Sequence, residues 1–339
     1  MEKPDTNASK DQDHCQLSEK YKQIYLPLTY SLIFILGLPL NGIVLWLCWR
    51  QTKPWSGATI YLVNLVVTDL LYVLTLPFLL VTYVLGDSWP FGELSCRLVR
   101  FLFYTNLYGG ILLLACISVD RFLGVCHPLR SLPYRTRWHA QLGATTTWAL
   151  VLLQLLPTLA FSHTDYINGK VICYDMTSPG KFDQYYAYSM VVMLSGFVFP
   201  SLVILTCHFL MIRSLTKPQE TLTRTGKVAR AKSIRTILLV CGLFVISFLP
   251  FHITRSFYLM VHFLSSQDCQ LLTAASIAHK IWRPLVSMNS CLNPILYFLS
   301  GVNNGVRLLK KLRQNKVDEH PAGAPGRLPR ALEIWVLPR

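Results

Sequence analysis

Seven long apolar stretches constrain what this chain can fold into more than any other feature. Each is long enough to cross the roughly 30 Å hydrocarbon core of a bilayer, for which a helix needs about 20 apolar residues. We expect the seven spans at residues 25–49, 58–84, 95–125, 140–162, 186–214, 232–262 and 271–299. The sequence therefore predicts an all-α membrane protein, a seven-transmembrane helix bundle that occupies residues 25–300.

The composition agrees with a membrane protein. Hydrophobic residues make up 52% of the chain and charged residues only 14%, whereas a soluble domain carries about 25% charge. Residues 1–23 are polar and of mixed charge. We therefore expect no cleavable signal peptide, and the first apolar segment would act as an uncleaved anchor.

The net charge of +15 is unevenly distributed along the chain. Basic residues gather in alternate loops, the positive-inside pattern of cytoplasmic segments, where they would meet anionic membrane lipid. The clusters are Arg130, Arg135 and Arg137, then seven basic residues from Arg213 to Arg235, then Lys310, Lys311, Arg313 and Lys316. This pattern predicts a multi-pass plasma-membrane protein with an extracellular N-terminus (1–24) and a cytoplasmic C-terminus, and it argues against a nucleic-acid partner.

The two ends of the chain carry further signals. Leucine and valine oppose lysine and arginine within residues 301–315, which predicts a short amphipathic eighth helix at the membrane surface. Residues 316–339 are rich in Pro, Gly and Ala and are expected to be a disordered cytoplasmic tail. The sequon at Asn7 fits a glycosylated extracellular N-terminus.

Four of the ten cysteines map to the extracellular side, which is oxidising. They are Cys15, Cys96, Cys173 and Cys269. Four cysteines allow three pairings, and the spacing does not choose among them.

Several ionisable residues lie in or beside the apolar spans. In the sixth span Pro250 is followed by His252 and Arg255, which share one helical face because they are three residues apart. An ionisable group at membrane depth indicates a functional site. Three more cations lie near the outer ends of the third and seventh spans: Arg100, Lys280 and Arg283. They could extend to the membrane interface, but five potential cations around one vestibule favour a polyanionic ligand held by charge-assisted hydrogen bonds.

The spans also carry short motifs in a fixed order, and together these resemble the rhodopsin-type (class A) G-protein-coupled receptors. The motifs are Asn41, Asp69, Cys96, Asp120-Arg121-Phe122, Trp148, Pro200, FxxxFLP and Asn293-Pro294-Ile295-Leu296-Tyr297. Within that class, GDSWPFG (86–92), the stretch 96–129, FLPFHITR (248–255) and KIWRPLVSMNSCLNPILYF (280–298) resemble the nucleotide-binding purinoceptors. The resemblance is closest to the members that respond to uridine and adenosine triphosphates (UTP and ATP).

This resemblance implies a binding site and two disulfides. The family pattern pairs Cys96 with Cys173 and Cys15 with Cys269. By resemblance, the phosphate-binding residues are Arg100, His252, Arg255, Lys280 and Arg283. Tyr104 and Phe251 are candidates to stack on the base or ribose, with ordinary aromatic packing as the alternative. Asp175, just after Cys173, would be either a lid that pairs with a pocket arginine until phosphate displaces it or a solvated loop carboxylate.

The resemblance also implies a signalling switch. Arg121 would pair with Asp120 at rest and contact a heterotrimeric G protein when the sixth helix swings about Pro250, while Tyr297 moves inward beside Pro294. Such a receptor would activate a Gq-type G protein, hence phospholipase C and calcium release, and would bind arrestin. Asp69, Asn289 and Asn293 resemble the sodium site of the class. Gly110, where many relatives have serine, removes one oxygen ligand from that site.

Other functions compete with this one. A class A receptor for another anion, such as a lysophospholipid, a leukotriene or a carboxylate, is the main alternative, and a non-signalling decoy is another. Transporters usually contain inverted repeats, which we do not find in this sequence. We find no HExxH motif and no convincing nucleophile–base set, so we expect neither an enzyme nor a cofactor.

Overall fold

The structure is a computed structural model that describes residues 22–51, 55–167, 169–174, 181–217, 224–264 and 268–299. Several predicted features lie outside these residues: Asn7, Cys15, Asp175, the 301–315 helix and the 316–339 tail. The side chain of Tyr297 is not described either. The first five helices are α1 (Lys22–Gln51), α2 (Gly57–Val73), α3 (Leu76–Val84), α4 (Gly92–Cys126) and α5 (Arg137–Phe161). A hairpin follows, made of β1 (Thr164–Ile167) and β2 (Lys170–Cys173). The remaining elements are α6 (Phe182–Met193), the π-helical turn η2 (Leu194–Val198), α7 (Phe199–Thr216), α8 (Arg224–Leu264), α9 (Cys269–Ser287) and α10 (Asn289–Leu299).

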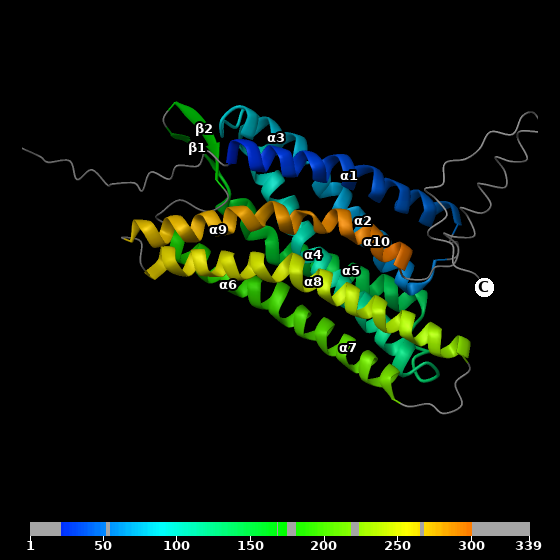
Figure 1. The fold of residues 1–339 in the computed structure, drawn as a ribbon. Helices are drawn as coiled ribbons and strands as arrows, with labels where there is room; N and C mark the ends of the chain where they lie inside the picture. Colours follow the sequence, from blue (N-terminus) through cyan, green and yellow to red (C-terminus); the bar gives the residue numbers. More distant parts are fainter. Residues whose placement is uncertain are drawn as a thin grey trace, which may run out of the picture. The chain divides into compact units, whose positions relative to one another are not determined.

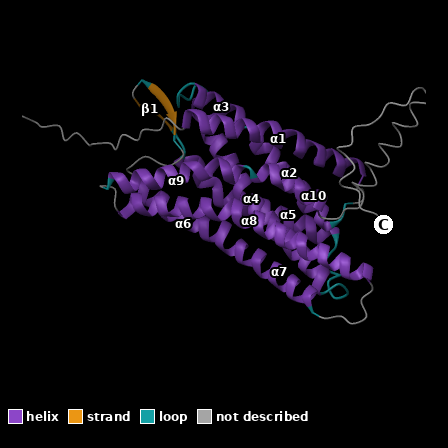
Figure 2. Cartoon of the chain, in the orientation of Figure 1, coloured by secondary structure: helices purple, strands orange, loops and turns teal. Residues whose placement is uncertain are grey.

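These helices form the seven predicted spans (Figures 1 and 2). Among the described residues, six helical segments are long and apolar enough to cross a membrane. They are α1, α2 with α3, α4, α5, α6 to α7, and α8. The seventh span consists of α9 and α10, which are separated at Met288. The prediction of a seven-transmembrane bundle is therefore confirmed, and its sixth helix begins at Arg224, eight residues before the predicted apolar span.

Proline accounts for two departures from continuous helix. Pro77 lies in the first turn of α3, and because proline has no N–H it cannot continue the hydrogen bonding of α2. Pro200 lies in the first turn of α7, directly after the π turn. A π turn holds one extra residue and shifts the face that the following helix presents. These breaks change which side chains of the second and fifth spans face the interior.

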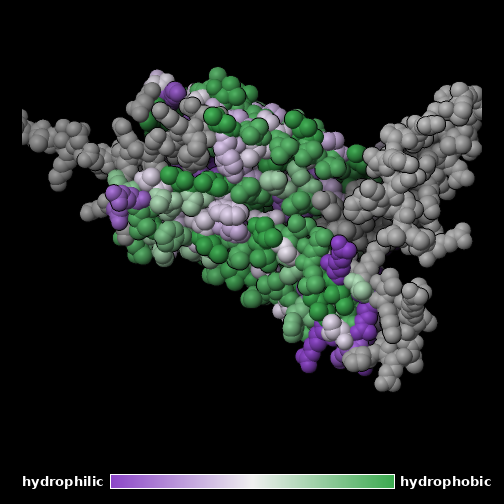
Figure 3. Space-filling view, in the orientation of Figure 1, coloured by the Kyte–Doolittle hydropathy of each residue, from purple (hydrophilic) through white to green (hydrophobic). Residues whose placement is uncertain are grey.

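Helix α4 lies at the centre of the bundle and packs against α2, α5 and α7. Its residues are buried without a break from Phe103 to Ile111, that is on all its faces, as expected for a central helix. Large apolar side chains cover the outside, for example Ile35, Phe199 and Ile246. Figure 3 shows these hydrophobic side chains along one face of the bundle, with hydrophilic ones gathered toward its ends. This surface suits lipid along its length and water at its ends.

The β1–β2 hairpin lies at the end of the bundle where α3 ends and α4 begins (Figure 1), which we call the hairpin end. The strands are antiparallel, with Thr164 opposite Cys173. A disulfide joins Cys173 to Cys96 at the start of α4, and the Trp89 N–H donates to the Val171 carbonyl at 2.7 Å. Cys269 is also disulfide-bonded. The sequence analysis predicted the Cys96–Cys173 pair but not the hairpin that positions it.

Candidate ligand site and switch

Arg255 of α8 lies over an aromatic ring near the hairpin end. Its guanidinium carbon is 4.5 Å from the centre of the Tyr104 ring on α4, and its Nη2 donates to the Tyr185 hydroxyl at 3.1 Å. The side chain is only 9% exposed. A desolvated cation over a ring is stabilised by about 2 kcal/mol, so these contacts hold the guanidinium inside the bundle rather than at its surface.

Arg100 of α4 binds the hairpin. Its Nη2 donates to the carbonyl of Cys173 at 3.0 Å, and the residue is 7% exposed. The adjacent disulfide between Cys173 and Cys96 fixes this carbonyl above the arginine. The hairpin thus covers the site and orients its first cation.

Arg283 of α9 completes the set of three arginines. Its guanidinium carbon lies 4.8 Å from the centre of the Phe103 ring. Phe103 is in turn 5.0 Å from the Tyr104 ring and 6.1 Å from the Phe251 ring. Phe103, Tyr104 and Phe251, which we call the aromatic platform, therefore connect Arg283 to Arg255. Lys280, half-buried, lies one turn from Arg283 on the same helix.

His252 is less suited to ligand contact than the arginines. Its ring stacks on Phe197 at 3.8 Å with an interplanar angle of 5°, and its Nδ1–H donates to the Phe248 carbonyl at 2.9 Å. Only 2% of the residue is exposed. The structure places it one turn deeper than Arg255, beside Phe251 and Tyr108, so its predicted role as a phosphate ligand stays a prediction.

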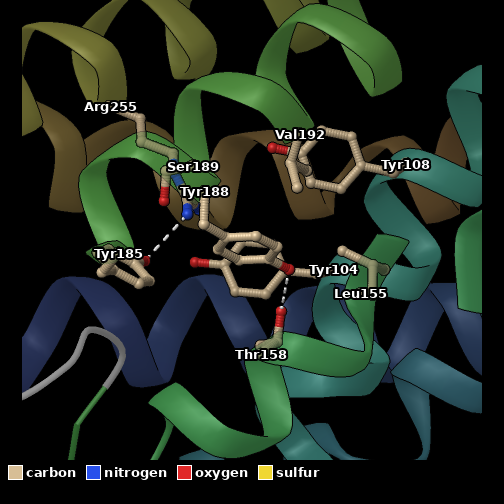
Figure 4. A pocket seen from close by; sticks show the side chains of 9 residues that line it. All are labelled: Tyr104, Tyr108, Leu155, Thr158, Tyr185, Tyr188, Ser189, Val192 and Arg255. Atoms are coloured by element: carbon tan, nitrogen blue, oxygen red, sulfur yellow. Dashed lines mark hydrogen bonds between the residues drawn. The ribbon is translucent and has the colours of Figure 1, made fainter. Parts of the chain in front are cut away.

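A small pocket lies next to Arg255, between α4, α5, α6 and α8 (Figure 4). It is nearly closed in the observed arrangement, with room for about one water molecule, whereas sites that hold a whole small molecule measure roughly 300–1,000 Å³. Tyr188 donates to the Gln154 carbonyl at 3.0 Å and bonds the Thr158 hydroxyl at 2.8 Å. The Ser189 hydroxyl is buried without a hydrogen-bond partner among the described residues. The lining residues are Tyr104, Tyr108, Leu155, Thr158, Tyr185, Tyr188, Ser189, Val192 and Arg255.

This arrangement can bind an anion joined to a flat ring. The guanidiniums of Arg255 and Arg283 lie over rings of one aromatic platform, and Arg100 lies one turn away on α4. Arginine binds phosphate or carboxylate oxygens through a planar fork of donors. Aromatic faces beside them would stack on a ring. The neighbouring pocket adds the Ser189 hydroxyl beside Arg255.

Deeper in the bundle, Asp69 of α2 is held by a network of amides. Its Oδ1 accepts from Asn106 Nδ2 at 2.8 Å and its Oδ2 from Asn293 Nδ2 at 2.9 Å. Ser290 donates to Asn106 Oδ1 at 3.3 Å, and its carbonyl accepts from Asn41 Nδ2 at 2.8 Å. The network connects four helices, and Asn106 is a member that the sequence analysis missed.

In the observed arrangement, amide groups compete with a sodium ion for the oxygens of Asp69. A hard cation requires several oxygen ligands, whereas amide hydrogens from Asn106 and Asn293 point at the two oxygens of Asp69. Gly110 adds no oxygen, and Asn289 begins α10. Sodium binding by Asp69, Asn289 and Asn293 therefore stays a prediction, and we expect it to be weak.

At the opposite end of α4, which we call the Asp120 end, the switch residues have unexpected surroundings. The Asp120 carboxylate accepts two hydrogen bonds from Arg135, each 3.0 Å long, whereas the sequence analysis named only Arg121 as its partner. Pro250 lies within the continuous helix α8, and Pro294 lies within α10. The roles of these residues as a switch stay predictions.

Sequence reasoning missed three residues of the ligand site, two aromatic residues and one serine. Phe103 and Tyr185 lie in apolar spans, where the sequence does not distinguish an aromatic residue that packs in the core from one that lines a ligand site. Ser189 was missed because a single serine in a span carries no pattern. The aromatic run at 185–188 (YYAY) was the available signal for the small pocket.

Comparisons with known proteins agree with this geometry. Residues 40–297 match the family described as "7 transmembrane receptor (rhodopsin family)". The chain is 41% identical to purinoceptor 3 of Gallus gallus over 301 residues, which are 87% of this chain and 90% of that protein. It is 42% identical to purinoceptor 2 of Homo sapiens over 310 residues (91% and 81% of the two chains). The identity to purinoceptor 4 of Homo sapiens is also 42%, over 298 residues (88% and 81%).

Proposed function

Because this chain belongs to the purinoceptors within the rhodopsin family of seven-transmembrane receptors, we propose that it is activated by extracellular nucleoside triphosphates such as UTP and ATP. The chain is a multi-pass plasma-membrane receptor and not an enzyme, and it acts through a G protein. The hairpin end would face the extracellular medium and the Asp120 end the cytosol. The basic loops beside the Asp120 end support this orientation.

One observation carries the proposal: arginines from two helices, Arg255 and Arg283, lie over rings of a single aromatic platform, and Arg100 lies one turn before that platform on α4. A triphosphate brings about four negative charges, and each charge-assisted hydrogen bond is worth roughly 1.5–3 kcal/mol. We assign the phosphates to Arg100, Arg255 and Arg283 and to Lys280 beside them. The base or ribose would stack on Tyr104 or Phe251, and Asp175 would act as the lid.

Signal transfer follows from a population shift. A nucleotide that binds the active packing of helices more tightly shifts the equilibrium toward it, and the G protein recognises the same state at the other end. We propose Gq as the G protein, with phospholipase C activation and calcium release, and arrestin as a further partner. Arg121 would make the G-protein contact when α8 swings about Pro250.

The test is calcium release in cells that lack nucleotide receptors and express this chain. UTP, UDP, ATP and ADP are applied with nucleotide-degrading enzymes controlled. We expect a response to a triphosphate that falls at least about tenfold in potency in Arg283→Ala. Arg97→Ala is the matched control, because Arg97 is exposed at the same end of α4 and pairs with Glu93. Silence to all four nucleotides, with the receptor at the surface, would contradict the proposal.

A receptor for a single-headed anion is the second candidate. Such a ligand has one charged group and needs one or two cations, so Lys280→Ala would hardly change its potency. A polyphosphate that spans several cations would lose affinity in this variant. To separate the two possibilities, lysophospholipids, leukotrienes and carboxylates are tested on the unmodified receptor and on the Lys280→Ala variant.

A further inference from the structure

The Asp120 end contains an ion pair of well-defined geometry. Arg135 Nε donates to Asp120 Oδ1 and Arg135 Nη2 to Asp120 Oδ2, both at 3.0 Å. The Asp120 side chain is 11% exposed and that of Arg135 is 37% exposed. Two parallel bonds from one guanidinium to one carboxylate form the strongest and most directional type of protein ion pair. Because both oxygens accept from Arg135, the charge of Asp120 is balanced by that residue.

The loop that carries Arg135 is folded against the end of α4. The Ser131 N–H donates to the His127 carbonyl and the Arg135 N–H to the Ser131 carbonyl, each at 3.0 Å. The buried Ser131 hydroxyl also donates to the Leu123 carbonyl at 3.2 Å. Thr136 then caps the first turn of α5. Arg135 therefore starts from a backbone position fixed by both helices, and little backbone entropy remains to be lost when its guanidinium meets Asp120.

A glycine makes room for this guanidinium. Gly124 lies one turn after Asp120 on α4, and a Cβ at this position would lie only 2.6 Å from Arg135 Nη1. Glycine costs a helix interior about 1 kcal/mol relative to alanine. Because Gly124 has no side chain, the Arg135 guanidinium can pass over this position and reach the Asp120 carboxylate.

Arg121 is the neighbour that this pair affects. Adjacent residues of a helix do not share a face, so Asp120 holds Arg121 poorly even when its oxygens are free. With the carboxylate charge balanced by Arg135, that hold is weaker still. Arg121 is itself partly buried at this end of α4.

We propose that Arg135 is a positioning residue of the switch: by binding both oxygens of Asp120 it weakens the hold of that carboxylate on Arg121, which can then turn to the G protein. Nothing in the ligand site enters this inference, which rests only on the G-protein role proposed for Arg121. Removing Arg135 returns an unbalanced carboxylate next to Arg121. The carboxylate then attracts Arg121, and coupling to the G protein falls.

Two variants break the pair by different means. Arg135→Gln removes the charge, whereas Gly124→Ala keeps every charge and displaces the flexible end of Arg135. We expect both to lower ligand-independent G-protein activation, and to shift agonist potency by about 5-fold or more. In the absence of G protein, both variants should bind agonist with unchanged affinity. A general loss of structure would lower this affinity too. Arg135→Lys, which keeps the charge but not the fork, should recover part of the loss.

Matched controls are available on the same chain. Arg137→Ala removes an exposed basic residue two positions further on, and Gly42→Ala adds a Cβ where nothing lies within 4 Å. Both should couple like the unmodified receptor. In an Asp120→Asn background the carboxylate is gone, so Arg135→Gln should have no further effect.

Thermal unfolding of the purified receptor tests the same pair of substitutions, singly and together, without a signalling assay. Arg135→Gln and Asp120→Asn should each lower the midpoint of thermal unfolding. The double variant should be no less stable than the less stable of the two single variants. Additive losses, higher basal activity in Arg135→Gln, or Gly124→Ala behaving like Gly42→Ala would each overturn the inference. A receptor silent to nucleotides would contradict only the proposed ligand, since basal coupling and unfolding need none.

Discussion

Replacing Arg255 with alanine removes the cation that the structure connects to both the aromatic platform and the small pocket. The guanidinium lies 4.5 Å above Tyr104 and donates to Tyr185 at 3.1 Å. In the liganded receptor we expect the same donors to bind a phosphate. One lost charge-assisted hydrogen bond costs about 1.5–3 kcal/mol. At 1.4 kcal/mol for each factor of ten, agonist affinity should fall about 10- to 150-fold.

Tyr185→Phe is the control for this prediction. It removes only the hydroxyl that accepts from Arg255 and keeps both the ring and the guanidinium. Because we expect a bound phosphate to take over this donor, the bond to the hydroxyl is already absent from the liganded receptor. Its removal should therefore cost less than about tenfold in affinity, or about 1.4 kcal/mol. Competition binding on membranes with matched receptor number measures both variants. The reasoning is refuted if Arg255→Ala stays within about 3-fold of the unmodified receptor, or if Tyr185→Phe loses as much.

Three other predictions concern Gly196, Asp69 and the hairpin disulfide. Gly196→Ala should lower the unfolding midpoint by several degrees, because its Cβ would lie 2.6 Å from the Tyr108 ring and overpacking costs about 1–3 kcal/mol; Gly242→Ala, in open space, should not, and equal midpoints would contradict the packing. Replacing sodium by N-methylglucamine at constant ionic strength should leave agonist affinity unchanged, because amides occupy both oxygens of Asp69; a clear shift would show a bound ion. Cys173→Ala should reduce surface expression and weaken agonist binding, since the hairpin loses its disulfide to Cys96; normal binding would show that the hairpin is held without it.

The architecture could be predicted from the sequence because spanning helices must be long and apolar. That single requirement located all seven spans to within a few residues, except where α8 extends beyond the membrane to Arg224. The β1–β2 hairpin has four-residue strands, too short to give an alternating pattern. The π turn at 194–198 has no sequence signature comparable to that of a spanning helix.

The site was predictable where a residue conflicts with its surroundings. Arg255 and Arg100 were found because cations are rare in apolar helices. Phe103 agrees with its surroundings, so only the structure shows that Arg283 lies over its ring. Arg135 was counted as one of several basic loop residues, and no spacing rule connects it to Asp120 fifteen positions earlier.

Equilibrium binding of radiolabelled UTP to the purified receptor tests the central claim most directly. The account predicts saturable binding that UTP or ATP displaces, that weakens as salt rises because the contacts are ionic, and that falls at least about tenfold in Arg255→Ala. Arg97→Ala should bind like the unmodified protein. Absence of saturable binding by correctly folded receptor, or equal binding by Arg255→Ala, would contradict the assignment of these arginines to a nucleotide's phosphates.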